Sequence, residues 1–276
     1  MIWLVILVVG LCAALLYWLL VTTEGAYLGA RVVQLIYDWG AGSYDEIKEF
    51  SEQEDDLFLA RPLMTALSQV RYPLVLDVAT GTGRLPLALL RYIDFQGYIL
   101  GLDISLNMLR EARRKTLPYG KLALIQKNAS LLPFSDESFH AVTCLEALEF
   151  LPDPNESLRE MARVLKVGGL LLTTNRVGFD YFLFPGRAFR QSSFEELMRE
   201  CGLDSVETKP WQEHYDLIWA RKTGNLSAGD RRLGWRELLL CPFCWINTFQ
   251  QESNALICGN CGRRFPFVDG ILCFDK

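Results

Sequence analysis

The sequence predicts an α/β protein with a doubly wound, mostly parallel sheet, an apolar helix before it and a small cysteine-rich module after it. Three observations lead to this prediction. Short apolar runs alternate with helix-like segments between residues 74 and 174. A glycine turn, Gly81-Thr-Gly83, follows the first of these runs. Residues 2–21 carry no charge, and four cysteines form two CxxC pairs near the end of the chain.

Composition narrows the class of protein further. The chain has 276 residues, of which 50% are hydrophobic and 22% charged, so it can bury a sizeable core. Its formal net charge of −5 argues against a large polyanionic partner, because phosphate backbones are bound by clustered Lys and Arg. We therefore expect no nucleic-acid partner.

The first segment, residues 1–22, has the length of a membrane span. About 20 apolar residues cross the ~30 Å hydrocarbon layer as a helix. Trp3 lies near one end, and Tyr17 and Trp18 lie near the other, as aromatic anchors do at the two interfaces. The start of the chain lacks the basic residues of a cleavable signal peptide. We expect an uncleaved anchor; a signal peptide and a buried core helix are the alternatives.

The flanks of this segment suggest its orientation. Arg31, on the C-terminal side, is the basic residue nearest to either flank, which favours a single-pass protein of the cell membrane with its body in the cytoplasm. Residues 23–43 have the pattern of an amphipathic helix, with apolar residues at 32, 33, 35, 36 and 39. We expect this helix to pack on the body and keep the membrane surface as the alternative.

The body follows as alternating elements. Residues 46–70 are predicted to be helical. Strands are predicted at 74–78, 98–102, 122–126, 141–144, 169–174 and 211–221, and helices from about 84 and at 106–114, 156–165 and 193–202. Gly168 is expected to cap the helix 156–165, and Ser193 the helix that follows it.

The predicted ligand site lies where the first two strands end. Asp77 stands in the first strand just before the glycine turn, and Asp103 ends the second strand. A carboxylate in the latter position can accept both hydroxyls of an adenosyl ribose. Pro86 replaces the third glycine of a dinucleotide fingerprint, which disfavours that class of ligand.

These residues carry a family resemblance. The segments 77–83, 102–109, 128–134, 149–153 and 161–169 resemble class I S-adenosylmethionine-dependent methyltransferases, the ubiquinone/menaquinone-type branch in particular. The resemblance implies a Rossmann-like, seven-stranded domain over residues 44–222, methyltransferase activity and S-adenosylmethionine as cofactor. It implies a cofactor-binding set of Tyr44, Asp77, Gly81, Gly83, Asp103, Ile104, Met108, Asn128, Ala129 and Leu145.

The catalytic residues stay unassigned. Phe150 stands where relatives often carry a histidine, which weakens any proposal of histidine base catalysis. His140 is expected to be structural. Aromatic residues at 181, 182, 184 and 189 have two interpretations, an apolar lid over the acceptor or ordinary core packing.

The last segment is a linker, residues 223–236, followed by a module at 237–276. Cys241, Cys244, Cys258 and Cys261 have the spacing of a structural Zn²⁺ site with four thiolate ligands. The module resembles the small zinc-ribbon activator proteins of tRNA and protein methyltransferases, which implies a possible protein partner.

Together these features predict a membrane-anchored methyltransferase acting on a lipid-soluble small molecule such as a quinone precursor. An RNA or protein acceptor, or a non-catalytic membrane-tethered scaffold, are the alternatives.

Overall fold

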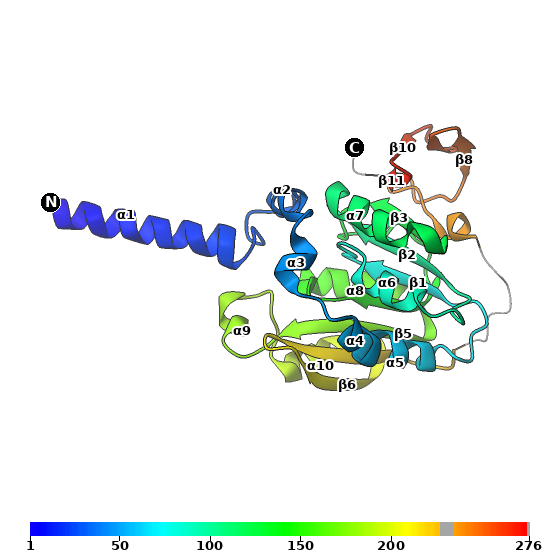
Figure 1. Ribbon diagram of the computed structural model, residues 1–276, viewed down its shortest axis with the longest axis horizontal. Coiled ribbons are helices and arrows are strands. Elements are labelled where there is room, and N and C mark those ends of the chain that lie inside the picture. The colour runs from blue at the N-terminus through cyan, green and yellow to red at the C-terminus, as the bar shows by residue number, and fades with distance from the viewer. Residues whose placement is uncertain (227–233, 275–276) are drawn as a thin grey trace.

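The computed structural model describes residues 1–226 and 234–274, and the middle of the predicted linker lies outside these residues. The body is a sheet with helices on both faces (Figure 1). Seven strands form the predicted domain: β1 (Leu74–Val78), β2 (Tyr98–Asp103), β3 (Leu122–Gln126), β4 (Phe139–Cys144), β5 (Leu165–Arg176), β6 (Leu203–Trp211) and β7 (Tyr215–Lys222). Their order is β6-β7-β5-β4-β1-β2-β3, with β7 antiparallel to both of its neighbours.

The strand order determines where a ligand can bind. The chain runs from β1 outward to β2 and β3, then returns to the other side of β1 with β4 and β5. All five residues of β1 are buried, as expected of a parallel strand covered on both faces. Ligands bind beside the carboxyl ends of the strands where the order reverses, which here is between β1 and β4.

The main helices follow the predicted pattern. They are α6 (Arg84–Leu90), α7 (Leu106–Thr116), α8 (Pro154–Val164) and α10 (Gln191–Glu200). The predicted helical stretch 46–70 is broken into α3 (Tyr44–Lys48), α4 (Glu52–Glu54), a π-helical segment (Asp55–Ala60) and α5 (Arg61–Ala66). The predicted last strand at 211–221 is mostly β7, and β6 before it was missed.

Two cap predictions are wrong. Gly168, with φ of +72°, lies inside β5 rather than at the end of α8, because the register of β4 with β5 shifts there and the chain bulges. A Cβ at Gly168 would lie 2.1 Å from the backbone nitrogen of Leu226, so this site also requires glycine for packing. Helix α10 begins two residues before Ser193, and its N-cap is Arg190.

The N-terminal segment leaves the body as a straight helix. Helix α1 (Ile2–Tyr17) continues into a π-helical turn (Trp18–Thr22), and together they form an uncharged 21-residue segment with a mean hydropathy of 2.9, none of it buried (Figure 1). Helix α2 (Ala30–Gly40) packs on the body as expected. Its Val33 is buried, and Asp38 accepts hydrogen bonds from the Ser105 hydroxyl at 2.6 Å and the Asn107 amide.

The C-terminal module continues the sheet, which is therefore larger than seven strands. Its strands are β8 (Phe249–Glu252), β9 (Ala255–Cys258), β10 (Arg264–Val268) and β11 (Ile271–Cys273), in the order β3-β11-β10-β9-β8. Strand β11 pairs in parallel with β3, Leu272 opposite Ile125. Backbone hydrogen bonds, among them Leu240 N to Pro133 O at 2.8 Å, join the start of the module to the loop after β3.

Candidate functional site

The first acid of the site, Asp77, ties three elements together at the end of β1. One of its carboxylate oxygens accepts a hydrogen bond from the Thr143 hydroxyl of β4, and the other accepts one from Thr80 in the glycine turn, both at 2.6 Å. Burial raises the pKa of Asp77 to about 6, and the two hydroxyl donors oppose that rise. The carboxylate therefore orders the turn against the sheet.

The second acid, Asp103, is hydrogen-bonded to the backbone of that turn. Its two oxygens accept hydrogen bonds at 2.8 Å from the amides of Gly81 and Ser105. Burial raises the pKa of Asp103 to about 6, although both amides stabilise the ionised form. A carboxylate offers about four lone-pair sites, so two acceptor positions remain for a ligand's hydroxyl groups.

The glycine turn leaves open space beside these acids. Gly81 has φ of +53°, and a Cβ built on it would meet nothing within 4 Å, so its backbone borders an open cavity. Gly83, with φ of +80°, faces a helix instead: a Cβ there would lie 3.0 Å from the Cβ of Ala112 in α7. The first glycine thus borders the site, and the second permits the close approach of α6 to α7.

Two adjoining cavities form the site. Both are bordered by Tyr44, Ala79, Gly81, Leu145 and Glu146. The first is lined by Asp103, Ile104, Asn128 and Ala129 on its sheet side, and by Ala30, Val33, Tyr37, Phe150, Leu151 and Pro152 on its apolar side. The second is lined by Asp77, Thr80, Thr82 and Arg84.

The structure thus brings eight of the ten residues expected to bind cofactor around these two adjoining cavities. Gly83 and Met108 are not among the described residues that line them. Met108 is fully buried in α7, where its amide donates to the hydroxyl of the capping residue Ser105. His140 also lies in the core, where its Nδ1 accepts a hydrogen bond from the amide of Leu74 and burial lowers its pKa to about 4.

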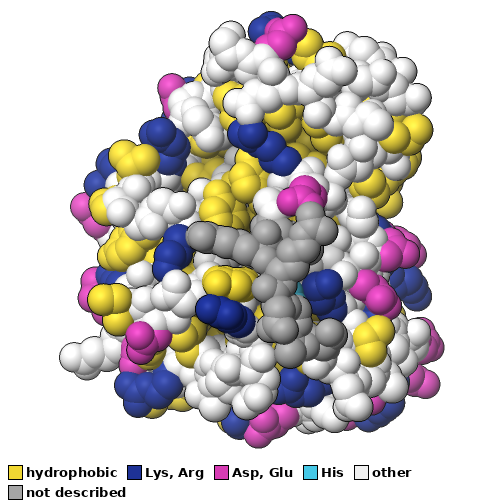
Figure 2. Space-filling view, turned by 90° about the vertical axis from the view of Figure 1, so that its right-hand side faces the viewer, with side chains coloured by type: hydrophobic (Ala, Val, Ile, Leu, Met, Phe, Trp, Pro, Cys, Tyr) yellow, Lys and Arg dark blue, Asp and Glu magenta, His cyan; other side chains and the backbone are white. Residues whose placement is uncertain are grey.

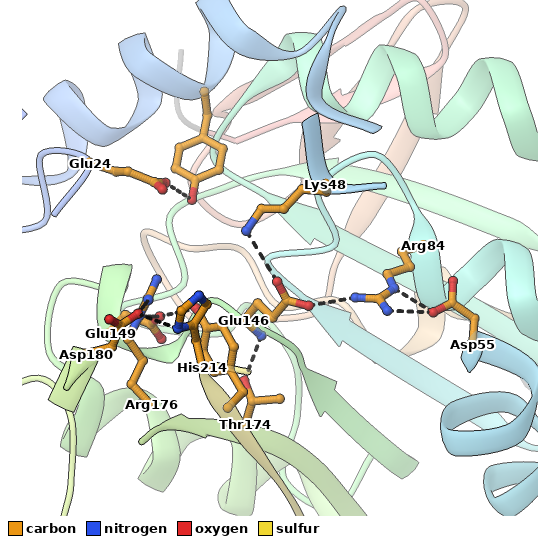
Figure 3. A network of polar contacts seen from close by, with 12 residues as sticks. Glu24, Lys48, Asp55, Arg84, Glu146, Glu149, Thr174, Arg176, Asp180 and His214 are labelled. Atoms are coloured by element: carbon orange, nitrogen blue, oxygen red, sulfur yellow. Dashed lines mark hydrogen bonds and ion pairs between the residues drawn. The ribbon is translucent and has the colours of Figure 1, made fainter. Parts of the chain in front are cut away.

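An ion-pair network that sequence reasoning missed borders the second cavity (Figure 3). The Arg84 guanidinium contacts Asp55 at 2.7 Å and Glu146 at 2.6 Å, and Lys48 contacts Glu146 at 3.3 Å. The Arg84 side chain is 10% exposed and stacks over the ring of Phe50. Glu146 follows Leu145, one of the residues expected to bind cofactor, whereas no pattern in the sequence marks Arg84.

A second network lies behind the apolar wall (Figure 3). Buried Glu149 accepts hydrogen bonds from Arg176 and from the Tyr215 hydroxyl, both at 2.6 Å. Arg176 also contacts Asp180 at 2.9 Å, and His214 contacts the same carboxylate at 3.2 Å. These contacts fix the segment that carries Phe150, one residue after Glu149.

Helix α2 forms the roof of the first cavity. Tyr37 lines the cavity, and its hydroxyl donates to Glu24 at 2.6 Å (Figure 3). Burial and the Glu24 carboxylate raise the pKa of Tyr37 well above its usual value, so it stays a neutral donor. The aromatic residues considered as a lid are not among the described lining residues. Phe184 packs edge-on behind Phe150, with ring centres 5.7 Å apart, and Phe182 is exposed.

The four cysteines of the CxxC pairs meet in the C-terminal module. All four sulfurs lie within 4.8 Å of one another, with Cys241 and Cys261 at 3.6 Å and Cys244 and Cys258 at 3.5 Å. A tetrahedral Zn²⁺ with sulfur ligands at about 2.3 Å requires sulfur–sulfur separations of about 3.8 Å. The four thiols therefore fit such an ion.

Comparison with known proteins agrees with this geometry. Residues 76–173 match the methyltransferase domain family. The chain is 41% identical over 159 residues to a demethylmenaquinone methyltransferase of Lysinibacillus sphaericus, covering 57% of this chain and 64% of the relative. It is 33% identical over 129 residues to the demethylmenaquinone methyltransferase of a Staphylococcus epidermidis strain, covering 47% and 54%. The chain thus spans less than two thirds of either relative.

Solved structures confirm the fold. The crystal structure of the [4+2]-cyclase SpnF superposes with a TM-score of 0.58 at 19% identity, covering 70% of this chain and 95% of that one. At this identity the likeness concerns the fold alone, and the name of that protein shows that the fold does not by itself determine the reaction. The predicted resemblance to class I S-adenosylmethionine-dependent methyltransferases is confirmed.

Proposed function

We propose that this chain is a class I S-adenosylmethionine-dependent methyltransferase that methylates a quinone precursor or a similar lipid-soluble molecule at a membrane. One observation carries the proposal. Two adjoining cavities have buried carboxylates and open glycine backbone on one side and an apolar wall on the other. The names of the two demethylmenaquinone methyltransferases support a quinone as the acceptor.

The polar side suits the cofactor. Asp103 retains acceptor positions for ribose hydroxyls, and Asn128 lines the same cavity, where an adenine edge would meet it. Gly81 offers backbone without a side chain. Glu146 and Asp77 border the second cavity and would face the positively charged methionine end of the cofactor.

The apolar side suits the acceptor and the reaction. S-adenosylmethionine supplies a methyl group bonded to a cationic sulfonium: when an acceptor atom attacks the methyl carbon, the carbon–sulfur bond breaks and the sulfur leaves as a neutral thioether. The residues of this chain then contribute position and exclusion of water rather than covalent chemistry. Val33, Phe150 and Leu151 form a surface on which a flat, apolar ring can lie.

The anchor fits such an acceptor. The apolar segment Ile2–Thr22 is long and apolar enough to span a bilayer, and none of its residues is buried. We propose a single-pass protein of the cell membrane with its catalytic domain in the cytoplasm, where S-adenosylmethionine is made. The four thiols of the C-terminal module would hold a structural Zn²⁺, and the module's outer face could receive a protein partner.

Methyl transfer tests the proposal directly. Full-length protein in lipid nanodiscs receives S-adenosylmethionine labelled on its methyl group together with a demethylated quinone or a lipid extract. Label should appear in the lipid fraction, and Asp103→Ala should abolish it, whereas Asp136→Ala, at an exposed carboxylate, should not. Absence of cofactor binding by the wild type would overturn the enzyme proposal, and label in RNA or protein would overturn the acceptor class.

A further inference from the structure

The exposed residues of α2 form one stripe. Arg31, Leu35 and Trp39 stand at i, i+4 and i+8, and every other residue of the helix is buried or half-buried. Leu35 is 68% exposed and Trp39 is 91% exposed. A basic residue followed by a leucine and a tryptophan on one face is the pattern of a helix that lies in a membrane interface.

Helix α9 (Asp180–Leu183) and the residue before it also expose apolar side chains. Its carboxylate, Asp180, is turned inward to Arg176 and His214, and the aromatic side chains of Phe179 and Phe182 point outward, 75% and 70% exposed. A helix that meets water has the reverse arrangement, with the acid outside and the phenylalanines inside.

Both helices adjoin the base of α1 (Figure 1). The Trp18 indole donates to the backbone oxygen of Leu183 at 3.2 Å, and the Tyr27 hydroxyl donates to that of Pro185 at 2.9 Å. The turn after α1 packs against α2: a Cβ at Gly25 would lie 2.8 Å from the Val32 side chain. The end of the apolar segment is therefore fixed between α2 and α9.

The occupant of this surface follows from its continuity with α1. We propose that α2 and α9 sit in the lipid interface around the base of α1, and that the acceptor enters the cavity from the bilayer beneath α2. This inference rests on the proposed membrane anchor. Over the described part of the face opposite α1, basic and acidic side chains are scattered among smaller apolar patches, as on a surface that meets water (Figure 2).

The route into the cavity follows from the two faces of α2. Ala30, Val33 and Tyr37 line the cavity, and the stripe of Arg31, Leu35 and Trp39 lies on the outer face. One helix therefore separates the proposed lipid phase from the proposed cofactor site. A lipid-soluble acceptor would reach Phe150 without crossing water, which avoids the free-energy cost of exposing its apolar surface.

The depth of single tryptophans in the bilayer tests this inference. Full-length protein is reconstituted in nanodiscs whose lipids carry bromine near the headgroup end of the acyl chains, and the emission lost to bromine is compared with that in unbrominated lipid. The emission of the Trp39→Phe variant is subtracted from that of the wild type, and the difference is the emission of Trp39. Trp3→Phe reports on α1, and Trp245→Phe, in the C-terminal module, is the matched control.

We expect the emission of Trp3 and Trp39 to be quenched and that of Trp245 to be unchanged. Quenching of Trp3 without Trp39 would overturn the interface inference and leave the anchor in place. Quenching of neither would overturn the anchor itself.

A kinetic readout separates lipid contact from folding. Replacing the exposed Phe179 and Phe182 by serine should raise KM for a bilayer-borne acceptor on the order of tenfold. The same change should leave the Kd for S-adenosylmethionine unaltered, because neither residue lines the cavity. An unchanged KM would contradict entry from the bilayer.

Discussion

Replacing Asp103 by asparagine should separate cofactor binding from folding. The carboxylate accepts the Gly81 and Ser105 amides on different oxygens, at 2.8 Å each. Asparagine keeps the shape but has one acceptor oxygen, so one of these amides loses its partner, at a cost of about 1–3 kcal/mol. The substitution also removes a buried charge. Because the pKa rises from 3.8 to about 6, holding that charge at pH 7.5 costs the ligand-free protein roughly 3 kcal/mol.

These two contributions to the stability of the ligand-free protein nearly cancel. We therefore expect the Tm of Asp103→Asn to stay within a few degrees of the wild type or to rise. The ribose, in contrast, loses charge-assisted hydrogen bonds worth about 3 kcal/mol together, which weakens the Kd for S-adenosylmethionine on the order of 100-fold.

Calorimetric titration and thermal unfolding of the same detergent-solubilised samples measure both quantities. Asp136→Asn, whose side chain is 74% exposed, is the control and should change neither. An unchanged Kd would refute the ribose assignment. A large fall in Tm would refute the argument that the buried charge is costly.

The remaining predictions concern pH, the buried ion pairs and the metal. Both Asp77 and Asp103 have pKa values raised from 3.8 to about 6, so the stability they contribute is full below pH 3.8 and is lost as pH rises through 6. A cofactor that needs both carboxylates should bind more weakly below pH 6 and release protons when it binds there. Calorimetric titration at pH 6 in buffers of different ionisation enthalpy measures this proton release. Binding without proton release would contradict the assignment. Arg84→Met leaves buried Asp55 without this cation and Glu146 with Lys48 in its place, and should lower the free energy of unfolding by about 3 kcal/mol. Denaturant titration measures this loss, and Arg61→Met, which removes a more exposed ion pair with Asp56, is the control. Equal losses in the two variants would contradict the prediction. Finally, purified protein should contain one zinc per chain by elemental analysis, and Cys258→Ser should lose it. Stoichiometric zinc in that variant would contradict the four-thiolate site.

The sequence predicted the central sheet well because its signals are local. The run from Leu74 to Val78 and the glycine turn after it define a buried strand and its ligand loop without reference to the rest of the chain. Gly168 was misassigned because a left-handed glycine serves a helix cap and a strand bulge equally. The pairing of β4 with β5, which only the fold provides, decides between them.

The parts of the site that were missed depend on contacts between distant segments. Nothing near Arg84 in sequence shows that Asp55 and Glu146 will meet it. An amphipathic segment such as α2 can pack on the body or lie on a membrane, and contacts of Asp38 with the N-cap of α7 and of Val33 in a cluster with Phe184 decide its position. The charge of Asp180 alone would place its side chain in water, but it points inward and pairs with Arg176.

The pairing of β11 with β3 has a consequence for the order in which the chain folds. Leu272 and Ile125 are about half of the chain apart, so this contact closes the longest loop of the sheet and carries a large loop-closure entropy. During synthesis the edge of β3 stays open until the C-terminal module has emerged, and an open edge is a template for wrong pairing. Translation arrest or cleavage before residue 271 should therefore leave an aggregation-prone intermediate in which the edge of β3 has no partner strand.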